Sequence, residues 1–296
     1  MRAVTVESFG GPEVLEIAET VVPEPAARQV RIKVAAAALN PVDAGVRSGV
    51  FGGAGKRLGL GWDVSGTVDA VGVATGWSVG DEVVALAYGA DKSFGTHADY
   101  VVVDTDAVAK APASADAVHA ATLPLNALTA SQALDLLALE PGQSLLVTGA
   151  AGAVGGYAVQ LAAHRGISVT AVAREADEAL VRSLGAARVV SGAVEPRSVD
   201  AVLDAALLGE AALEWVRDGG VFSGVIPGAQ PASVRGVRTD AVEVSPDGAR
   251  LAELVALVDE GVLTLRVAET YALDEAAKAH ARLAEGGLRG RLVLVP

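Results

Sequence analysis

Hydrophobic and polar residues alternate with a period of two in the first part of the chain, up to about residue 118. Short runs rich in β-branched residues are separated by turn sequences such as Gly10-Gly11-Pro12, and the clearest runs are 30–34, 66–71, 82–86 and 100–103. Alternate side chains share one face of a strand, so such runs between turns indicate half-buried strands. The pattern predicts a mainly β unit.

From about Leu123 the pattern becomes an alternation of buried strand and helix. Val154, Ala158, Leu161 and Ala162 recur at a helical period, Gly185 is expected to end a helix over 176–184, and a third helix is predicted over 210–217. Strands are expected at 145–148, 167–173, 188–190, 201–203 and 221–225. Strands that alternate with helices form a parallel sheet with right-handed crossovers.

The last fifty residues predict helix, strand, helix and strand. Ser245 is expected to cap the first helix, with Pro246 at its first position, and this helix is predicted to reach Gly261. The later elements are expected at 265–267, 273–284 and 291–295.

Composition narrows the classes of partner and site. The 296 residues include 36 acidic and 23 basic ones, a net charge of −13, and no cationic cluster that would favour nucleic acid or an anionic membrane. There is no cysteine, and the four histidines have no metal-ligand spacing, so neither a disulfide nor a metal site is expected. No apolar run approaches the roughly 20 residues of a membrane span, and the first residues lack a signal-peptide pattern, which favours a cytoplasmic protein.

A glycine-containing turn between a predicted strand and a predicted helix is the main candidate for ligand binding. Its spacing is G-x-x-G-x-x-G rather than the usual G-x-G-x-x-G. Small residues let the backbone approach a pyrophosphate, and the N–H groups that open a helix complement its charge. The residues predicted to bind a dinucleotide are Gly149, Ala150, Ala151, Gly152, Ala153 and Val154. The alternative is a tight turn without a ligand.

The end of the second strand of this unit indicates which dinucleotide is bound. Binders of NAD commonly carry an acidic residue there, which accepts from the ribose 2′-hydroxyl. Here Ala173 takes that place and Arg174 follows, and a guanidinium suits a 2′-phosphate. The sequence therefore favours NADPH over NADH. The alternative is an exposed Arg174 that pairs with Glu175 or Asp177.

Short motifs follow one another in a distinctive order and spacing along nearly all 296 residues. These are Asn40-Pro41-Val42-Asp43, Arg47-Ser48-Gly49, Gly61-Trp62-Asp63-Val64-Ser65-Gly66-Thr67-Val68, Val79-Gly80-Asp81-Glu82-Val83, Gly95-Thr96-His97-Ala98-Asp99-Tyr100, Leu128-Thr129-Ala130, the turn at 149–155, Leu184-Gly185-Ala186, Gly219-Gly220 and Arg289-Gly290-Arg291-Leu292-Val293-Leu294. In these motifs the whole chain resembles the zinc-independent quinone oxidoreductases of the medium-chain dehydrogenase/reductase superfamily.

The resemblance implies an α/β protein of two interleaved domains. A GroES-like, mainly β substrate domain comprises residues 1–118 and 264–296, and an inserted Rossmann domain with a doubly wound parallel sheet, residues 119–263, binds NADPH. Members of the family commonly form homodimers, and their active site lies between the two domains.

The resemblance also implies a reaction without a metal. Asn40 and Trp62 stand where zinc-dependent relatives have metal ligands, so alcohol oxidation, which benefits from a Lewis acid, is disfavoured. Hydride transfer from NADPH to a quinone or another conjugated carbonyl fits better, because the accepting system delocalises the charge. An enoyl-thioester or 2-alkenal reductase is one alternative, and a catalytically weak NADPH-binding sensor is another.

Several residues receive roles from the resemblance. Asn40 is expected near the nicotinamide and the substrate carbonyl, where its N–H polarises an oxygen; equally, it is a turn asparagine before proline. Phe51 replaces a tyrosine found near the substrate in many relatives, so Tyr88 or solvent is expected to supply the proton, and Asp43, Asp63 and His97 are further polar candidates. The other residues expected to contact the cofactor are Thr129, Ala205, Gly224, Val225, Ile226 and Arg291, of which Arg291 is alternatively a surface residue.

Overall fold

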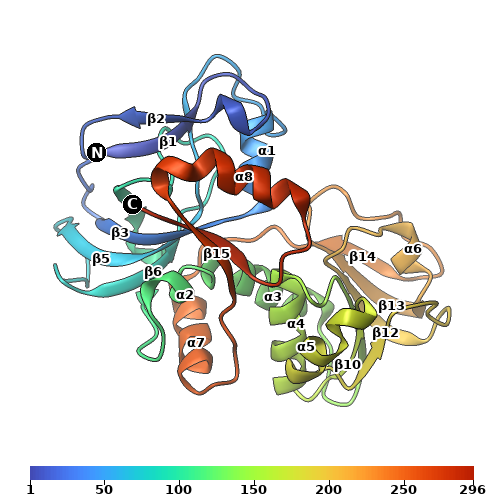
Figure 1. Ribbon diagram of the computed structural model, residues 1–296. Helices are drawn as coiled ribbons and strands as arrows, with labels where there is room; N and C mark the ends of the chain where they lie inside the picture. Colours follow the sequence, from blue (N-terminus) through green and yellow to red (C-terminus); the bar gives the residue numbers. More distant parts are fainter. The chain divides into compact units, whose positions relative to one another are not determined.

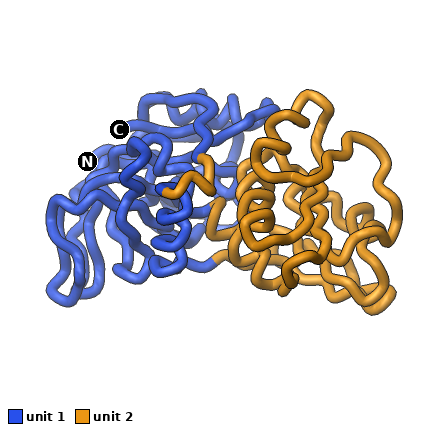
Figure 2. The backbone as a smooth tube through the Cα atoms, turned by 90° about the horizontal axis from the view of Figure 1, so that it is seen from below, with its two compact units in different colours: residues 1–125, 245–259, 265–296 blue, residues 126–244, 260–264 orange.

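The computed structural model describes all 296 residues, which form two compact units (Figure 2). Unit 1 comprises residues 1–125, 245–259 and 265–296, and unit 2 comprises residues 126–244 and 260–264. Unit 2 is thus inserted into the chain of unit 1. The compact units differ from the predicted domains chiefly over 245–259, and the domain bounds 1–118 with 264–296 and 119–263 stay a prediction.

Unit 1 is built on antiparallel β structure (Figure 1). Its strands are β1 (Arg2–Val6), β2 (Glu16–Glu19), β3 (Gln29–Leu39), β4 (Leu58–Gly59), β5 (Asp63–Val71), β6 (Glu82–Leu86), β7 (Tyr100–Asp104), β8 (Val108–Lys110), β15 (Val267–Ala272) and β16 (Arg291–Val295). The larger sheet has the order β15-β16-β3-β5-β6-β8, with β7 also paired to β3, and the smaller has the order β2-β1-β4. Of these strands, β15 and β16 pair in parallel, whereas the others pair antiparallel.

Short helices cover the sheets of unit 1. They are η1 (Pro12–Val14), α1 (Pro41–Ser48), η2 (Thr105–Ala107), α2 (Ala117–Ala120), α7 (Gly248–Asp259), η4 (Leu273–Glu275) and α8 (Ala276–Glu285). One hydrophobic core joins Val4, Leu39 and Leu292 to Ala279 of α8, and a second lies around Ile32, Val64 and Val83. Burial alternates along β3 up to Ala35 and becomes continuous from Ala36, so the second half of this strand is covered on both faces.

Unit 2 is a doubly wound sheet of six parallel strands (Figure 1). The strands are β9 (Ser144–Thr148), β10 (Ser168–Val172), β11 (Arg188–Val190), β12 (Val199–Asp204), β13 (Val216–Gly224) and β14 (Arg238–Ala241). Their order, β11-β10-β9-β12-β13-β14, is that of dinucleotide-binding folds. The helices are α4 (Ala153–His164), η3 (Glu175–Asp177), α5 (Glu178–Ser183), α6 (Glu210–Leu213) and α3 (Pro124–Leu137), which starts at the boundary between the units. The predicted α/β fold class, GroES-like β domain plus Rossmann sheet, is confirmed.

Two elements differ from their predictions. The helix expected over 210–217 ends at Leu213, because Val216 pairs with Val199 and opens β13. The predicted Ser245 cap is also wrong: α7 starts at Gly248, and Asp247 Oδ1 accepts from Arg250 N at 2.9 Å. No helix of the protein is long and apolar enough to cross a membrane.

Candidate active site

The glycine turn of unit 2 adopts a compact conformation that depends on two of its glycines. Gly149 has φ +58°, in the left-handed region that glycine adopts without strain. A Cβ on Gly155 would lie 2.3 Å from the carbonyl oxygen of Gly149, so a side chain there would force the turn open. The amide of Gly152 donates to the same Gly149 oxygen at 2.8 Å. The turn therefore folds back directly onto the start of α4.

Helix α4 follows this turn with a backbone suited to a phosphate. Gly152 is its N-cap residue and contributes no side chain, and Ala153 and Val154 begin the helix. The first-turn N–H groups of a helix have no partner within it, and together with the helix dipole they favour an anion. Ala150 and Ala151 are buried beside them. The predicted residues thus fit a pyrophosphate.

A buried pair of polar side chains joins the carboxyl ends of β9 and β12, next to the glycine turn. Thr148 Oγ1 donates to Asp204 Oδ1 at 2.5 Å and accepts from Ala206 N at 2.9 Å, while Asp204 Oδ2 accepts from Gly209 N at 2.8 Å. The carbonyl carbon and oxygen of Ala205 lie 3.3 Å from the position of a Cβ on Gly149. Sequence reasoning missed Thr148 and Asp204, although each is the polar residue that ends an apolar strand.

Arg174 follows β10 directly, where the nucleotide-selecting residue is expected. Its Nε donates to Asp177 Oδ2 at 3.2 Å, which is one of the pairings the sequence allows. The Arg174 side chain is nevertheless 65% exposed, whereas that of Asp177 is 7% exposed. A contact with a 2′-phosphate stays a prediction.

The remaining predicted cofactor residues of unit 2 lie on later elements. Gly224 ends β13, Val225 is half-buried and Ile226 is exposed. These residues, Ala205 and the glycine turn all follow the carboxyl ends of parallel strands, the edge at which such sheets bind ligands. Thr129 is buried on α3. Their contacts with a cofactor stay predictions.

In unit 1, Asn40 and Asp63 form a buried hydrogen-bonded pair. Asn40 is the N-cap residue of α1, and its Nδ2 donates to Asp63 Oδ2 at 2.6 Å. The other carboxylate oxygen of Asp63 accepts from Leu125 N, also at 2.6 Å. Burial raises the pKa of Asp63 to about 7, against the opposing effects of these two donors and the charge of Arg291. Asp63 thus fixes the orientation of the Asn40 amide.

Asp43 joins the start of α1 to the turn before β5. Its Oδ2 accepts from Asn40 N and its Oδ1 accepts from Gly61 N, both at 2.8 Å. Gly61 has φ +96°, and a Cβ there would lie 2.4 Å from His97 N. Both Asp43 oxygens therefore serve backbone donors, which fits a positioning role. A catalytic role for Asp43 stays a prediction.

A lysine that sequence reasoning missed lies against Trp62. Lys92 Nζ is 5.0 Å from the centre of the Trp62 ring and donates to Ala87 O at 2.5 Å. Burial lowers the pKa of Lys92 to about 8, although the charges of Asp43 and Asp63 act in the opposite direction. Tyr88 packs edge-on against Trp62, with ring centres 5.1 Å apart. Within Asp91-Lys92-Ser93 nothing in the sequence distinguishes this lysine from an exposed loop residue.

The other predicted residues of unit 1 have varied surroundings. Phe51 is 54% exposed and lies over Gly45 of α1. Arg291 is half-buried at the start of β16, and its charge lowers the pKa of Asp63. His97 is buried, and its Nε2 donates to Ala38 O at 3.1 Å. The roles assigned to Phe51 and Arg291 stay predictions.

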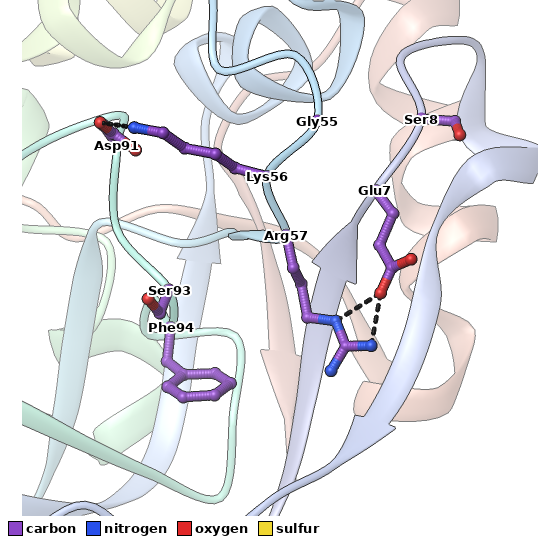
Figure 3. Close-up of a pocket in the computed structure, with 8 residues that line it drawn as sticks. All are labelled: Glu7, Ser8, Gly55, Lys56, Arg57, Asp91, Ser93 and Phe94. Atoms are coloured by element: carbon purple, nitrogen blue, oxygen red, sulfur yellow. Dashed lines mark hydrogen bonds and ion pairs between the residues drawn. The ribbon is translucent and has the colours of Figure 1, made fainter.

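A groove of about 790 Å³ on unit 1 borders this region (Figure 3). Two ion pairs cross its lining: Lys56 with Asp91 at 2.6 Å, and Arg57 with Glu7. The groove is lined by Glu7, Ser8, Gly55, Lys56, Arg57, Asp91, Ser93 and Phe94. None of the predicted site residues is among them, so the groove does not define the active site. No group of three or more His, Asp or Glu residues is arranged to hold a metal ion.

Comparisons with known proteins agree with this architecture. A model of the alcohol dehydrogenase GroES-like domain matches residues 26–113, and a model of a zinc-binding dehydrogenase matches residues 174–294. An NADPH-dependent alkenal/one oxidoreductase of Arabidopsis thaliana chloroplasts is 38% identical over 81% of this chain and 66% of its own length. A 2-methylene-furan-3-one reductase of Solanum lycopersicum is 32% identical over 100% of this chain and 79% of its own length.

A solved structure of similar shape extends the comparison to the whole fold. The quinone oxidoreductase of Coxiella burnetii is 28% identical, with a TM-score of 0.87, over 100% of this chain and 99% of that one. The chain belongs to the medium-chain dehydrogenase/reductase superfamily, among its quinone oxidoreductase-like members.

Proposed function

We propose that this protein is an NADPH-dependent reductase of quinones and other conjugated carbonyls. The observation that carries the proposal is the buried Asn40–Asp63 pair, which holds a neutral amide donor where zinc-dependent relatives have a metal ligand. A neutral donor suits a substrate whose conjugation spreads the incoming charge. The glycine turn at 149–154 supports the cofactor, and the relatives that reduce quinones, alkenals and a furanone support the substrate class.

In the proposed reaction, bound NADPH supplies a hydride from C4 of its nicotinamide. Asp63 accepts from the Asn40 amide and so fixes the plane of that amide. In this proposal the Asn40 amide polarises the carbonyl of a bound substrate and hydrogen-bonds to its oxygen more strongly as negative charge develops. Asp63 prevents the amide from rotating, and Asp43 fixes the backbone of Asn40 at the start of α1.

Arg174 is proposed to bind the 2′-phosphate of NADPH. It lies at the carboxyl end of the second strand of the sheet and is largely exposed, with a guanidinium that forms strong bonds to phosphate. Its pairing with Asp177 through Nε holds the side chain at the edge of the sheet.

The proposal is tested by following NADPH oxidation with ortho- and para-quinones, 2-alkenals and a crotonyl thioester. We expect turnover with quinones or 2-alkenals and a higher kcat/KM with NADPH than with NADH. Turnover restricted to the thioester would identify an enoyl-thioester reductase. Tight NADPH binding with no oxidation of any substrate would contradict the proposal and favour the sensor. A homodimer, proposed from the family, is checked by light scattering after size exclusion.

A further inference from the structure

The ammonium group of Lys92 lies beside the residues that replace metal ligands. By the resemblance, Asn40 and Trp62 occupy two ligand positions of the zinc-dependent relatives. Lys92 Nζ lies 5.0 Å from the centre of the Trp62 ring, and Asp63, next to Trp62 in the chain, binds the Asn40 amide. A cation of this chain is therefore held next to the positions at which those relatives hold a metal ion.

The backbone of unit 1 fixes Lys92 in this place. The Lys92 carbonyl oxygen accepts from Gly59 N at 2.8 Å, and a Cβ on Gly59 would lie 2.3 Å from Phe94 Cα, so only glycine permits this approach. On the other side, Ala87 N donates to Trp62 O at 2.7 Å, and Ala87 O accepts from Lys92 Nζ. Ala87 thus links the Lys92 ammonium group to the backbone of Trp62.

Two nearby carboxylates favour the charged form of Lys92, whereas burial of its ammonium group disfavours that form. Asp43 on α1 and Asp63 on β5 attract it, while His97 lies close enough for the lysine charge to lower the histidine pKa. Neighbouring Asp91 is bonded to Lys56, and Tyr88 packs on Trp62. Burial outweighs the two carboxylates and lowers the pKa of Lys92 to about 8, so at pH 7 the group is still mainly charged.

We propose that Lys92 hydrogen-bonds to the carbonyl oxygen of the substrate and stabilises the negative charge that develops there, in place of a metal ion. The proposal rests on the proposed reductase function and names a second donor for it beside Asn40. The substrate class it favours is a conjugated carbonyl whose oxygen becomes an enolate or phenolate oxygen.

The atoms and electrons of this step balance without a further reactant. The substrate gains a hydride, with its electron pair, at the β-carbon, while NADPH is oxidised to NADP⁺. The π electrons of the C=C bond form the new C=C bond of the enolate, and those of the C=O bond move to the oxygen beside the lysine. Water then supplies the proton that completes the reduction, and Lys92 keeps its own.

The first test separates the effect of the Lys92 charge on kcat from the effect of its side-chain volume. Lys92→Met keeps an unbranched stem over Trp62 without the charge, and loss of one such donor is expected to lower kcat about 100-fold with little change in the Kd for NADPH. Lys92→Arg keeps the charge and is expected to recover most of the rate. Lys110→Met is the matched control, because Lys110 Nζ lies 5.8 Å from the centre of the Trp77 ring, away from this site.

The pH profile separates an electrostatic role from a structural one. Wild-type kcat is expected to fall as the pH rises through about 8, where Lys92 loses its charge. In Lys92→Arg this fall should move upward by more than one pH unit, because arginine remains charged. A Lys92→Met enzyme with near wild-type kcat, or an unchanged profile in Lys92→Arg, would overturn the proposal.

A second measurement does not depend on turnover. The chain has five lysines, so ¹³Cε-labelled lysine gives five NMR signals, and Lys92→Arg identifies the one of interest. In the NADP⁺ complex, 4-nitrophenolate, an oxyanion probe, should raise the Lys92 pKa. Binding of this probe without such a shift would overturn the proposal. If the wild-type protein reduces no substrate, the reductase function fails, and this measurement still decides whether Lys92 binds an oxyanion.

Discussion

Asn40 Nδ2 donates to Asp63 Oδ2 across 2.6 Å, and neither residue is more than 1% exposed. An asparagine before proline at the start of a helix commonly uses its side chain to cap that helix. Here Asn40 and Asp43 form a capping box at the start of α1, in which Asp43 accepts from Asn40 N, and Asn40 Nδ2 in addition donates to a carboxylate on β5. The N-cap position of Asn40 agrees with the turn interpretation. Its contact with the nicotinamide and the substrate carbonyl stays a prediction.

Replacing Asp63 by asparagine should disrupt this pair while leaving the size of the side chain unchanged. An amide oriented to accept from Leu125 N would present its NH₂ group to the NH₂ group of Asn40, which leaves a buried donor unsatisfied at a cost of about 1–3 kcal/mol. We expect Asp63→Asn to lower the free energy of unfolding by that amount and to lower kcat about tenfold. Urea denaturation and steady-state kinetics measure the two effects.

Asp69→Asn is the matched control for this change, since Asp69 lies on the same strand, near its other end, and pairs with Arg31 of β3. Its effect on kcat should be small. Equal losses of kcat in the two variants would show that Asp63 merely supports the fold of β5.

The His280 ring should make the protein sensitive to mild acid. His280 is 1% exposed, and Arg47 Nη1 donates to its Nδ1 at 3.1 Å. Burial, with the nearby His97 and Arg47 charges, lowers the pKa of His280 to about 3 from 6.5. The unfolded chain therefore binds more protons between these values, so the stabilisation is complete above pH 6.5 and is lost as the pH falls toward 3.

His280→Asn preserves an acceptor for Arg47 and cannot titrate. Above pH 7 the variant should be less stable than the wild type, because part of the ring volume is lost. Below pH 6.5 the difference in unfolding free energy should shrink by up to about 1.4 kcal/mol per pH unit. Urea denaturation from pH 4.5 to 7.5 measures this, and two parallel stability curves would contradict the expected neutral, buried ring.

Arg174 should distinguish the two nicotinamide cofactors. Loss of a charge-assisted bond to phosphate costs about 1.5–3 kcal/mol, so Arg174→Ala should raise the KM for NADPH more than about tenfold and leave that for NADH nearly unchanged. Arg182→Ala is the control, because Arg182 pairs with Glu178 on neighbouring α5 and is similarly exposed. Equal effects of Arg174→Ala on both cofactors would contradict the 2′-phosphate assignment.

Local sequence patterns predicted most helices and strands. They did not predict contacts between residues that lie far apart in the chain. The parallel sheet and the turn at Gly149 follow from short-range periodicity and spacing. The helix predicted to reach residue 217 ends at Leu213, because Val216 pairs with Val199 of β12 and opens β13, a contact between distant segments that local periodicity does not show. Lys92 was missed because its neighbours Trp62 and Asp63 lie about thirty residues away in the chain, and only the folded sheet brings them together.

The glycine turn offers a direct test of close packing at the proposed cofactor site. A Cβ on Gly155 would lie 2.3 Å from the Gly149 carbonyl oxygen, and that contact is with backbone, which cannot rotate away. Gly155→Ala should therefore push α4 from the turn, lower the free energy of unfolding by about 1–3 kcal/mol and weaken NADPH binding at least tenfold. Gly192→Ala is the control, because no atom lies within 4 Å of its Cβ position and its backbone is not in the left-handed region. Calorimetric titration with NADPH and urea denaturation measure both effects. Unchanged affinity in Gly155→Ala would mean that the turn binds no pyrophosphate, the interpretation that the spacing alone leaves open.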